Sequence, residues 1–146
     1  MSVGFVLFRL GERTFATRLD EVREIVRLQG LERLPGMAPP LAGVIVLRGR
    51  PVPVLDVRAP GSPSDSGDVL VIDSGADTVG VAVDEVSAVL HPDELPEGDA
   101  APKALPGYVV GVHSYGGNPV LLVHLPALLD TSAAGWQESL PNSVRS

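Results

Sequence analysis

The sequence has no cysteine and few aromatic residues. Without Cys among its 146 residues, the chain cannot form disulfides, thiolate nucleophiles or thiolate metal sites, and this composition is compatible with a reducing compartment. Aromatic residues make up 4% of the chain, while apolar residues make up 45%. A hydrophobic core must therefore be built mainly from Val, Leu and Ala.

Basic residues are scarce and scattered. The chain has 11 Lys and Arg against 18 Asp and Glu, which gives a formal net charge of −7, and no segment concentrates the basic residues. Such a surface repels nucleic-acid phosphates and anionic lipids. We therefore expect no nucleic-acid partner.

A long apolar run of the kind that enters a membrane is also missing from the start of the sequence. The segment MSVGFVLF has no basic residue before its apolar stretch, and Arg9 interrupts the stretch. It is too short for a signal peptide or a bilayer span. We expect a cytoplasmic protein with no direct membrane insertion.

Glycine and proline, by contrast, are abundant and regularly placed. The 16 Gly and 14 Pro residues divide Val-rich segments of five to seven residues, a pattern typical of short strands joined by tight turns. Segments 29–42 and 91–107 hold several prolines and are predicted to be loops, and the segment APGSPSDSG at 59–67 is a linker by composition. The predicted hairpins are 4–10 with 14–18, 43–47 with 51–57, 68–73 with 78–83, and 108–113 with 119–125.

The two halves of the chain repeat one pattern. Gly11 and Gly75 are 64 residues apart and occupy matching turns, as do Gly49 and Gly117, which are 68 residues apart. Strand patterns recur in the same order around them. We therefore predict an all-β protein made of two similar five-stranded barrels packed together, with short helices only, one of them at 126–130.

Few residues suggest catalysis or metal binding. Asp73 ends an apolar strand in the sequence Asp-Ser-Gly-Ala, a pattern also found in retropepsin-like aspartic hydrolases, but Asp, Ser and Gly are equally the residues that hairpin turns select. His91, His113 and His124 are interpreted as surface or half-buried residues, because a zinc site needs three or four converging ligands. The sign-alternating run at 20–24 indicates a solvated surface.

The segment GVIVLRGRPVPVLDVR at 43–58 resembles the segment of CheW-type coupling proteins that reads Gly-Val-Ile-Asn-Leu-Arg-Gly, followed by an apolar run ending in Asp-Leu-Arg. The opening FVLFRLGERTFATRLDEVREIVR is similar to the first hairpin and connecting strand of that family. The segments VIDSGADTVGVAVDEVSAVL and YVVGVHSYGGNPVLLVHLPALL are similar to its second half. The resemblance covers residues 3–130.

This resemblance implies a fold and a division of the chain. The family consists of two five-stranded SH3-like barrels, in agreement with the internal repeat. We place a single domain at residues 1–130, with one subdomain at about 15–70 and the other at about 71–130, and leave open an exchange of the N-terminal strand. Residues 131–146 are expected to be a mobile tail, in which Trp136 would gain most by packing on the domain.

The resemblance also implies a function without catalysis or cofactors. Members of the family are adaptors that join the regulatory domain of a CheA-type histidine kinase to the cytoplasmic tips of chemoreceptors. The corresponding partner-binding positions are Val22, Glu24, Gly43, Leu47 and Arg48. Two alternatives are kept: a scaffold for a different kinase pathway, such as surface motility or a regulatory array, and, more distantly, the aspartic hydrolase.

Two features depart from the family pattern. Val46 occupies the position of the usual Asn before Leu-Arg-Gly, so a side chain that could hydrogen-bond the hairpin backbone is missing. The short linker at 59–67 replaces a basic, leucine-containing stretch. Contacts made by that stretch are expected to differ in this chain.

Overall fold

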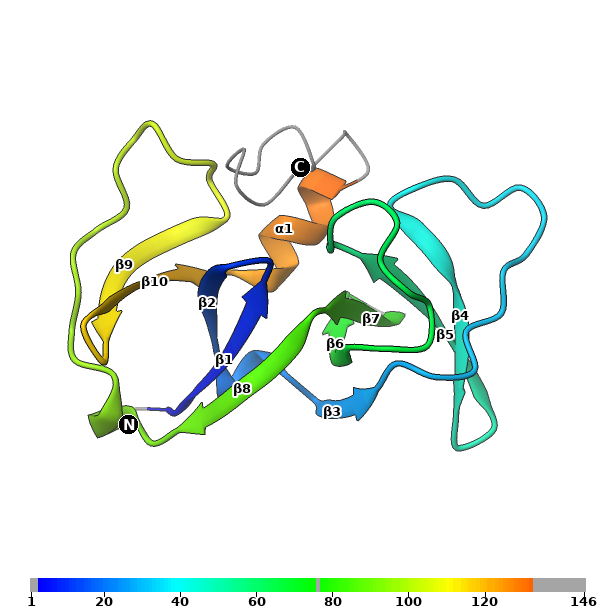
Figure 1. Cartoon of the computed structure of the whole chain (residues 1–146), viewed down its shortest axis with the longest axis horizontal. Coiled ribbons are helices and arrows are strands. Elements are labelled where there is room, and N and C mark those ends of the chain that lie inside the picture. Colours follow the sequence, from blue (N-terminus) through cyan, green and yellow to red (C-terminus); the bar gives the residue numbers. More distant parts are fainter. Residues whose placement is uncertain (1–2, 76, 133–146) are drawn as a thin grey trace.

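The computed structural model describes residues 3–75 and 77–132, and within these ranges ten strands form two five-stranded sheets, each curled into a half-barrel. The half-barrels lie side by side, and helix α1 (Leu125–Ser132) lies between them (Figure 1). The predicted all-β fold with two similar five-stranded units and short helices is confirmed. The strands are β1 (Phe5–Leu10), β2 (Arg13–Arg18), β3 (Glu24–Arg27), β4 (Leu41–Leu47), β5 (Arg50–Asp56), β6 (Asp68–Ser74), β7 (Asp77–Val83), β8 (Glu85–Leu90), β9 (Val109–Tyr115) and β10 (Asn118–Val123). Two short 3₁₀ helices are η1 (Leu19–Glu21) and η2 (Pro92–Glu94).

The two sheets have the same topology and exchange their hairpins. The strand orders are β3-β6-β7-β5-β4 and β8-β1-β2-β10-β9, so the hairpin β1–β2 belongs to the sheet of the second half and β6–β7 to that of the first. Each exchanged hairpin joins its host through a parallel pair, in which Val54 lies opposite Gly80 in one sheet and Leu122 opposite Ala16 in the other. These two pairs are related by the offsets of 68 and 64 residues found in the sequence. The repeat is therefore a repeat of structure.

The exchange changes the predicted subdomain boundaries. A division at about residue 70 would cut β6, whereas the sheets separate at Asp84, between β7 and β8. The complete hairpin of residues 5–18 joins the second half, instead of the first strand alone, because β1 and β2 pair over their whole length. Helix α1 also extends past the predicted end of the domain at residue 130, and the rest of the predicted tail, with Trp136, lies outside the described residues.

The main core lies between the exchanged hairpins. Val6 and Phe8 of β1 pack in one cluster with Leu70 and Ile72 of β6, while the alternate residue Leu7 faces the interior of its own half-barrel. Both faces of β1 and β6 are thus buried. This double burial explains why these strands are continuous apolar runs in the sequence, FVLF and VLVI, with no alternation of polar residues.

The proline-rich segments are loops, as predicted, and each crosses an edge strand once. Glu32 forms an isolated bridge with Val44 of β4, and Asp99 forms the matching bridge with Val112 of β9. These contacts pair part of the outer edge of each sheet. In the described ranges, neither α1 nor the 3₁₀ helices are long and apolar enough to cross a bilayer.

Candidate functional site

Three of the five predicted partner-binding residues meet at one open groove of about 730 Å³, at the end of the half-barrel that contains β3 to β7. Glu24 comes from the start of β3, and Leu47 and Arg48 from the tight turn between β4 and β5. The apolar part of the lining is Leu47, Pro51, Val52, Pro53, Val71 and Val79. The charged part is Arg23, Glu24, Arg48, Arg50 and Asp77. An apolar floor with a charged rim is typical of a protein-binding surface.

Arg48 and Glu24 form a two-pronged ion pair across the groove. Arg48 Nη1 donates to Glu24 Oε1 at 2.6 Å, and Nη2 donates to Oε2 at 2.8 Å. The hydrogen bonds from Arg48 hold the pKa of the Glu24 carboxyl below its ordinary value, so the interaction persists at neutral pH and is lost only as pH falls through that lowered value. Because β3 and β4 are the two edge strands of this sheet, the pair also joins the open ends of the half-barrel.

The backbone of Arg48 is unusual for a residue with a side chain. Arg48 and Gly49 both have positive φ, at 50° and 79°, and they form the two-residue turn between β4 and β5. At the matching turn of the other sheet, Gly116 and Gly117 have φ of 59° and 82°. Glycine adopts this conformation with little strain, whereas arginine does so at a cost. The fold thus tolerates arginine where glycine would be better, and only the half with the groove carries it.

A second ion pair lies beside the first. Arg23 Nη1 donates to Asp73 Oδ1 at 3.1 Å, and Thr78 Oγ1 donates to the same oxygen at 3.0 Å. A retropepsin-like site would require Asp73 to share a proton with a second carboxylate. The Asp73 side chain is 57% exposed, and its contacts within the described ranges are with Arg23 and Thr78. This geometry favours a turn residue over a catalytic one.

Val22 and Gly43 occupy different positions from the other three predicted residues. Val22 follows η1 and is half-buried against the central core, one residue before Arg23. Gly43 is buried in β4, where a Cβ atom would collide with the carbonyl oxygen of Glu32. Val22 can thus contribute an apolar contact close to the groove, whereas Gly43 is required by the packing of the loop against β4.

The packing of Gly43 leads to a test. Changing Gly43 to Ala forces the Glu32 segment away from β4, and overpacking of this kind lowers the free energy of unfolding by ~1–3 kcal/mol. Urea denaturation would measure the change. Gly107→Ala is the matched control, because a Cβ atom at Gly107 meets nothing within 4 Å. Equal effects of the two substitutions would contradict the packing role.

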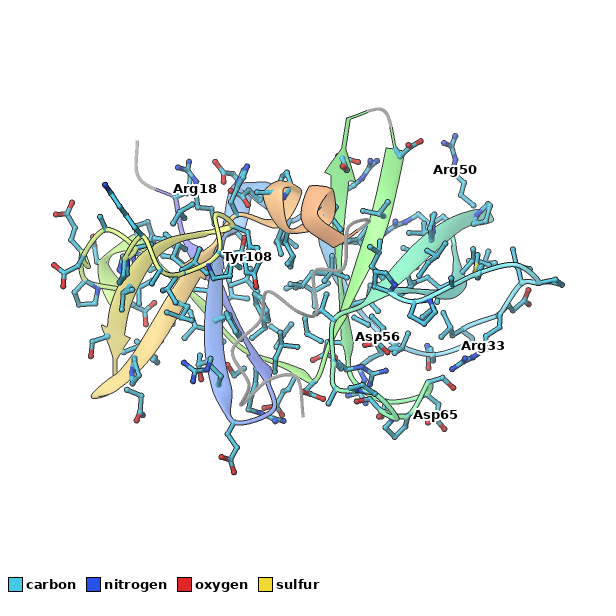
Figure 2. All side chains as sticks on the ribbon, turned by 90° about the horizontal axis from the view of Figure 1, so that it is seen from above. Arg18, Arg33, Arg50, Asp56, Asp65 and Tyr108 are labelled. Carbon is cyan, nitrogen blue, oxygen red and sulfur yellow. The ribbon has the colours of Figure 1, made fainter. Side chains whose placement is uncertain are left out.

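The sequence did not identify Arg58 as a structural residue, although it lies in the motif. Its guanidinium donates from Nε and Nη2 to the two Asp56 carboxylate oxygens, both at 2.9 Å, and to the carbonyl oxygens of Pro63 and Ser66, both at 2.8 Å. The side chain is 1% exposed. Figure 2 shows the labelled Asp56 beside the loop that carries Asp65. The segment predicted as a linker is therefore a closed loop held by one buried arginine.

The three histidines lie in separate places. His113 Nδ1 is 2.8 Å from the Pro96 carbonyl oxygen, and His124 Nδ1 is 3.0 Å from Glu21 Oε2. His91 begins η2. Within the described ranges, no group of three or more His, Asp and Glu side chains could hold a metal ion.

Comparison with known proteins agrees with this architecture. The chain is 26% identical over 147 aligned residues to the chemotaxis protein CheW of Klebsiella aerogenes, covering 95% of this chain and 89% of that protein. It is 31% identical over 103 residues to the chemotaxis protein CheW of Bacillus subtilis, covering 64% and 66% of the two chains. The crystal structure of the scaffolding protein TtCheW from Thermoanaerobacter tengcongensis has the same fold, with a TM-score of 0.70, 20% identity and coverage of 86% of both chains.

A family model described as the CheW-like domain matches residues 4–133, which include all ten strands and helix α1. With the exchanged hairpins, the paired half-barrels and this match over nearly the whole chain, the protein belongs to the CheW-like domain family.

Proposed function

We propose that this chain is a cytoplasmic chemotaxis adaptor that couples a CheA-type histidine kinase to the cytoplasmic tips of chemoreceptors. The observation that carries the proposal is the groove with the Arg48–Glu24 pair, in a chain whose full-length relatives are chemotaxis proteins. The adaptor holds its partners together and needs no cofactor for that task.

The groove suits a receptor hairpin, which presents helices with apolar and charged faces. Val79 lines the groove and also packs against the core shared by the two sheets, so the floor begins near the junction of the half-barrels. A helix laid on this floor would bury Leu47 and Val52 and place its polar flanks against the rim. The regulatory domain of the kinase would then bind an end of the paired half-barrels, leaving the groove to the receptor.

Arg48 is the residue expected to contribute most to receptor binding. Its guanidinium is 76% exposed while held in one geometry by Glu24, so it presents its remaining N–H groups to a partner without a large loss of side-chain freedom on binding. The positive φ of Arg48 is explained in the same way. A strained residue persists where the side chain has a use that glycine cannot supply.

Arg48→Gly tests the function separately from the fold. This substitution copies the turn of the other half, so we expect the melting temperature to stay within a few degrees of the wild type while the affinity for the receptor falls by about tenfold or more. Isothermal titration calorimetry with a purified receptor cytoplasmic fragment, encoded in the same genome, measures the affinity. Circular dichroism measures the melting temperature.

The control is Arg33→Gly, which removes an exposed arginine in a loop outside the groove. If both variants bind as tightly as the wild type, Arg48 has no role in binding. A pull-down with the CheA-type regulatory domain and the receptor fragment tests the coupling itself. Capture of a kinase domain from another signalling system, in place of the CheA-type domain, would favour the scaffold alternative.

A further inference from the structure

Arg50 differs from the other arginines of the groove because its charge is not neutralised within the chain. Arg23 is paired with Asp73, and Arg48 with Glu24. In the described ranges, Arg50 makes neither an ion pair nor a side-chain hydrogen bond, although it lines the same groove. Figure 2 shows its side chain extending outward from the end of β5, beyond the neighbouring strands.

The pseudo-symmetry of the fold shows that the turn itself does not require this arginine. Arg50 and Pro51 begin β5, and Asn118 and Pro119 begin the matching strand β10. Those residues line a corresponding hollow at the end of the other half-barrel, where the neutral Asn118 occupies the position of Arg50. The fold therefore forms this turn without a cation, and the charge of Arg50 is available for another purpose.

We propose that Arg50 is a specificity-determining residue that selects a receptor hairpin carrying a carboxylate beside its apolar contact face. This inference rests on the proposed function. An arginine next to an apolar floor can cover that floor with its methylene stem while its guanidinium binds a partner carboxylate with two hydrogen bonds. The first turn of the chosen helix face would place Asp or Glu opposite Arg50.

The remaining charges of the groove sharpen the selection. Asp77, at the start of the neighbouring strand β7, also lines the groove and repels a second carboxylate at its own position. The chain as a whole carries a net charge of −7, so an acidic partner is repelled everywhere except at a local cation. A receptor segment with one carboxylate at the Arg50 position therefore fits better than a uniformly acidic segment.

The test is calorimetric binding of the receptor cytoplasmic fragment to charge variants of Arg50. We expect Arg50→Ala to weaken binding by about twofold to fivefold, as for an exposed ion pair, and Arg50→Glu to weaken it by about tenfold or more through like-charge repulsion. The difference between wild type and Arg50→Ala should shrink between low and high salt. One Glu→Lys or Asp→Lys change in the fragment should restore the binding of Arg50→Glu.

The matched control is Arg33→Glu, which changes the net charge by the same amount at an exposed arginine outside the groove. Equal affinities of Arg50→Glu and Arg33→Glu would overturn the inference while leaving the proposed function intact. Restoration by none of the acidic-to-lysine variants would overturn it as well. If the wild-type chain does not bind the fragment, the proposed function fails, and the selection by Arg50 fails with it.

Discussion

Replacement of Phe8 by alanine is expected to lower the free energy of unfolding by ~3–5 kcal/mol, the range for truncating a large aromatic residue in a core. Phe8 is 1% exposed and stacks on Phe15 with ring centroids 5.7 Å apart. It lies in the cluster between the exchanged hairpins, so the cavity left by Phe8→Ala cannot be filled from solvent or by a movable loop.

The same substitution should destabilise both sheets together. Since β1–β2 and β6–β7 each complete the sheet of the opposite half, neither half-barrel keeps its five strands when the hairpins separate. Urea denaturation followed by circular dichroism and by amide exchange in β4 and β9 would report on the two sheets independently. Coincident transitions are expected, and an early transition in one sheet would contradict the shared core.

Val46→Ala is the control for this experiment. Val46 lies in edge strand β4 and is 60% exposed, so its truncation should change the free energy of unfolding by no more than about 0.5 kcal/mol. A large loss at Val46 would indicate that exposed edge residues, and not the shared core, determine the stability of the fold.

The strands and their turns could be predicted from the sequence because they depend on neighbouring residues. Gly75 and Gly117 mark turns that the chain makes within a few residues, and the offset between the two halves is visible in the positions of such glycines. The exchange of hairpins could not be predicted in the same way. A hairpin satisfies its local pattern equally well in either sheet, and the choice depends on contacts between residues far apart in the chain.

The candidate site shows the same limit. The resemblance placed Glu24, Leu47 and Arg48 at a binding surface, and the mismatch between Arg48 and Gly116 in the repeat singled out the arginine before its partner was known. The contact of Arg48 with Glu24 spans 24 residues, and that of Arg23 with Asp73 spans 50. Pairs so distant have no signature in local composition, so an alternation of charges was interpreted only as a solvated surface.

Arg58 gives the largest expected contrast with Arg48 in the same motif. Arg58→Ala leaves the Asp56 carboxylate, whose side chain is 23% exposed, without its cation, and it leaves the carbonyl groups of Pro63 and Ser66 without their donor. Breaking a buried pair on one side in this way typically costs ~3–5 kcal/mol. We therefore expect Arg58→Ala to lower the urea midpoint strongly and to loosen loop 59–67, measured by amide exchange.

A double-mutant cycle separates the loss of the pair from the loss of the side chain. Asp56→Leu combined with Arg58→Met removes both charges and keeps apolar volume, so the double variant should be more stable than Arg58→Ala. Neither residue lines the groove, and receptor affinity measured well below the melting temperature should stay at the wild-type value. A drop in affinity as large as that of Arg48→Gly would contradict this division, in which Arg58 stabilises the fold and Arg48, ten positions earlier, binds the partner.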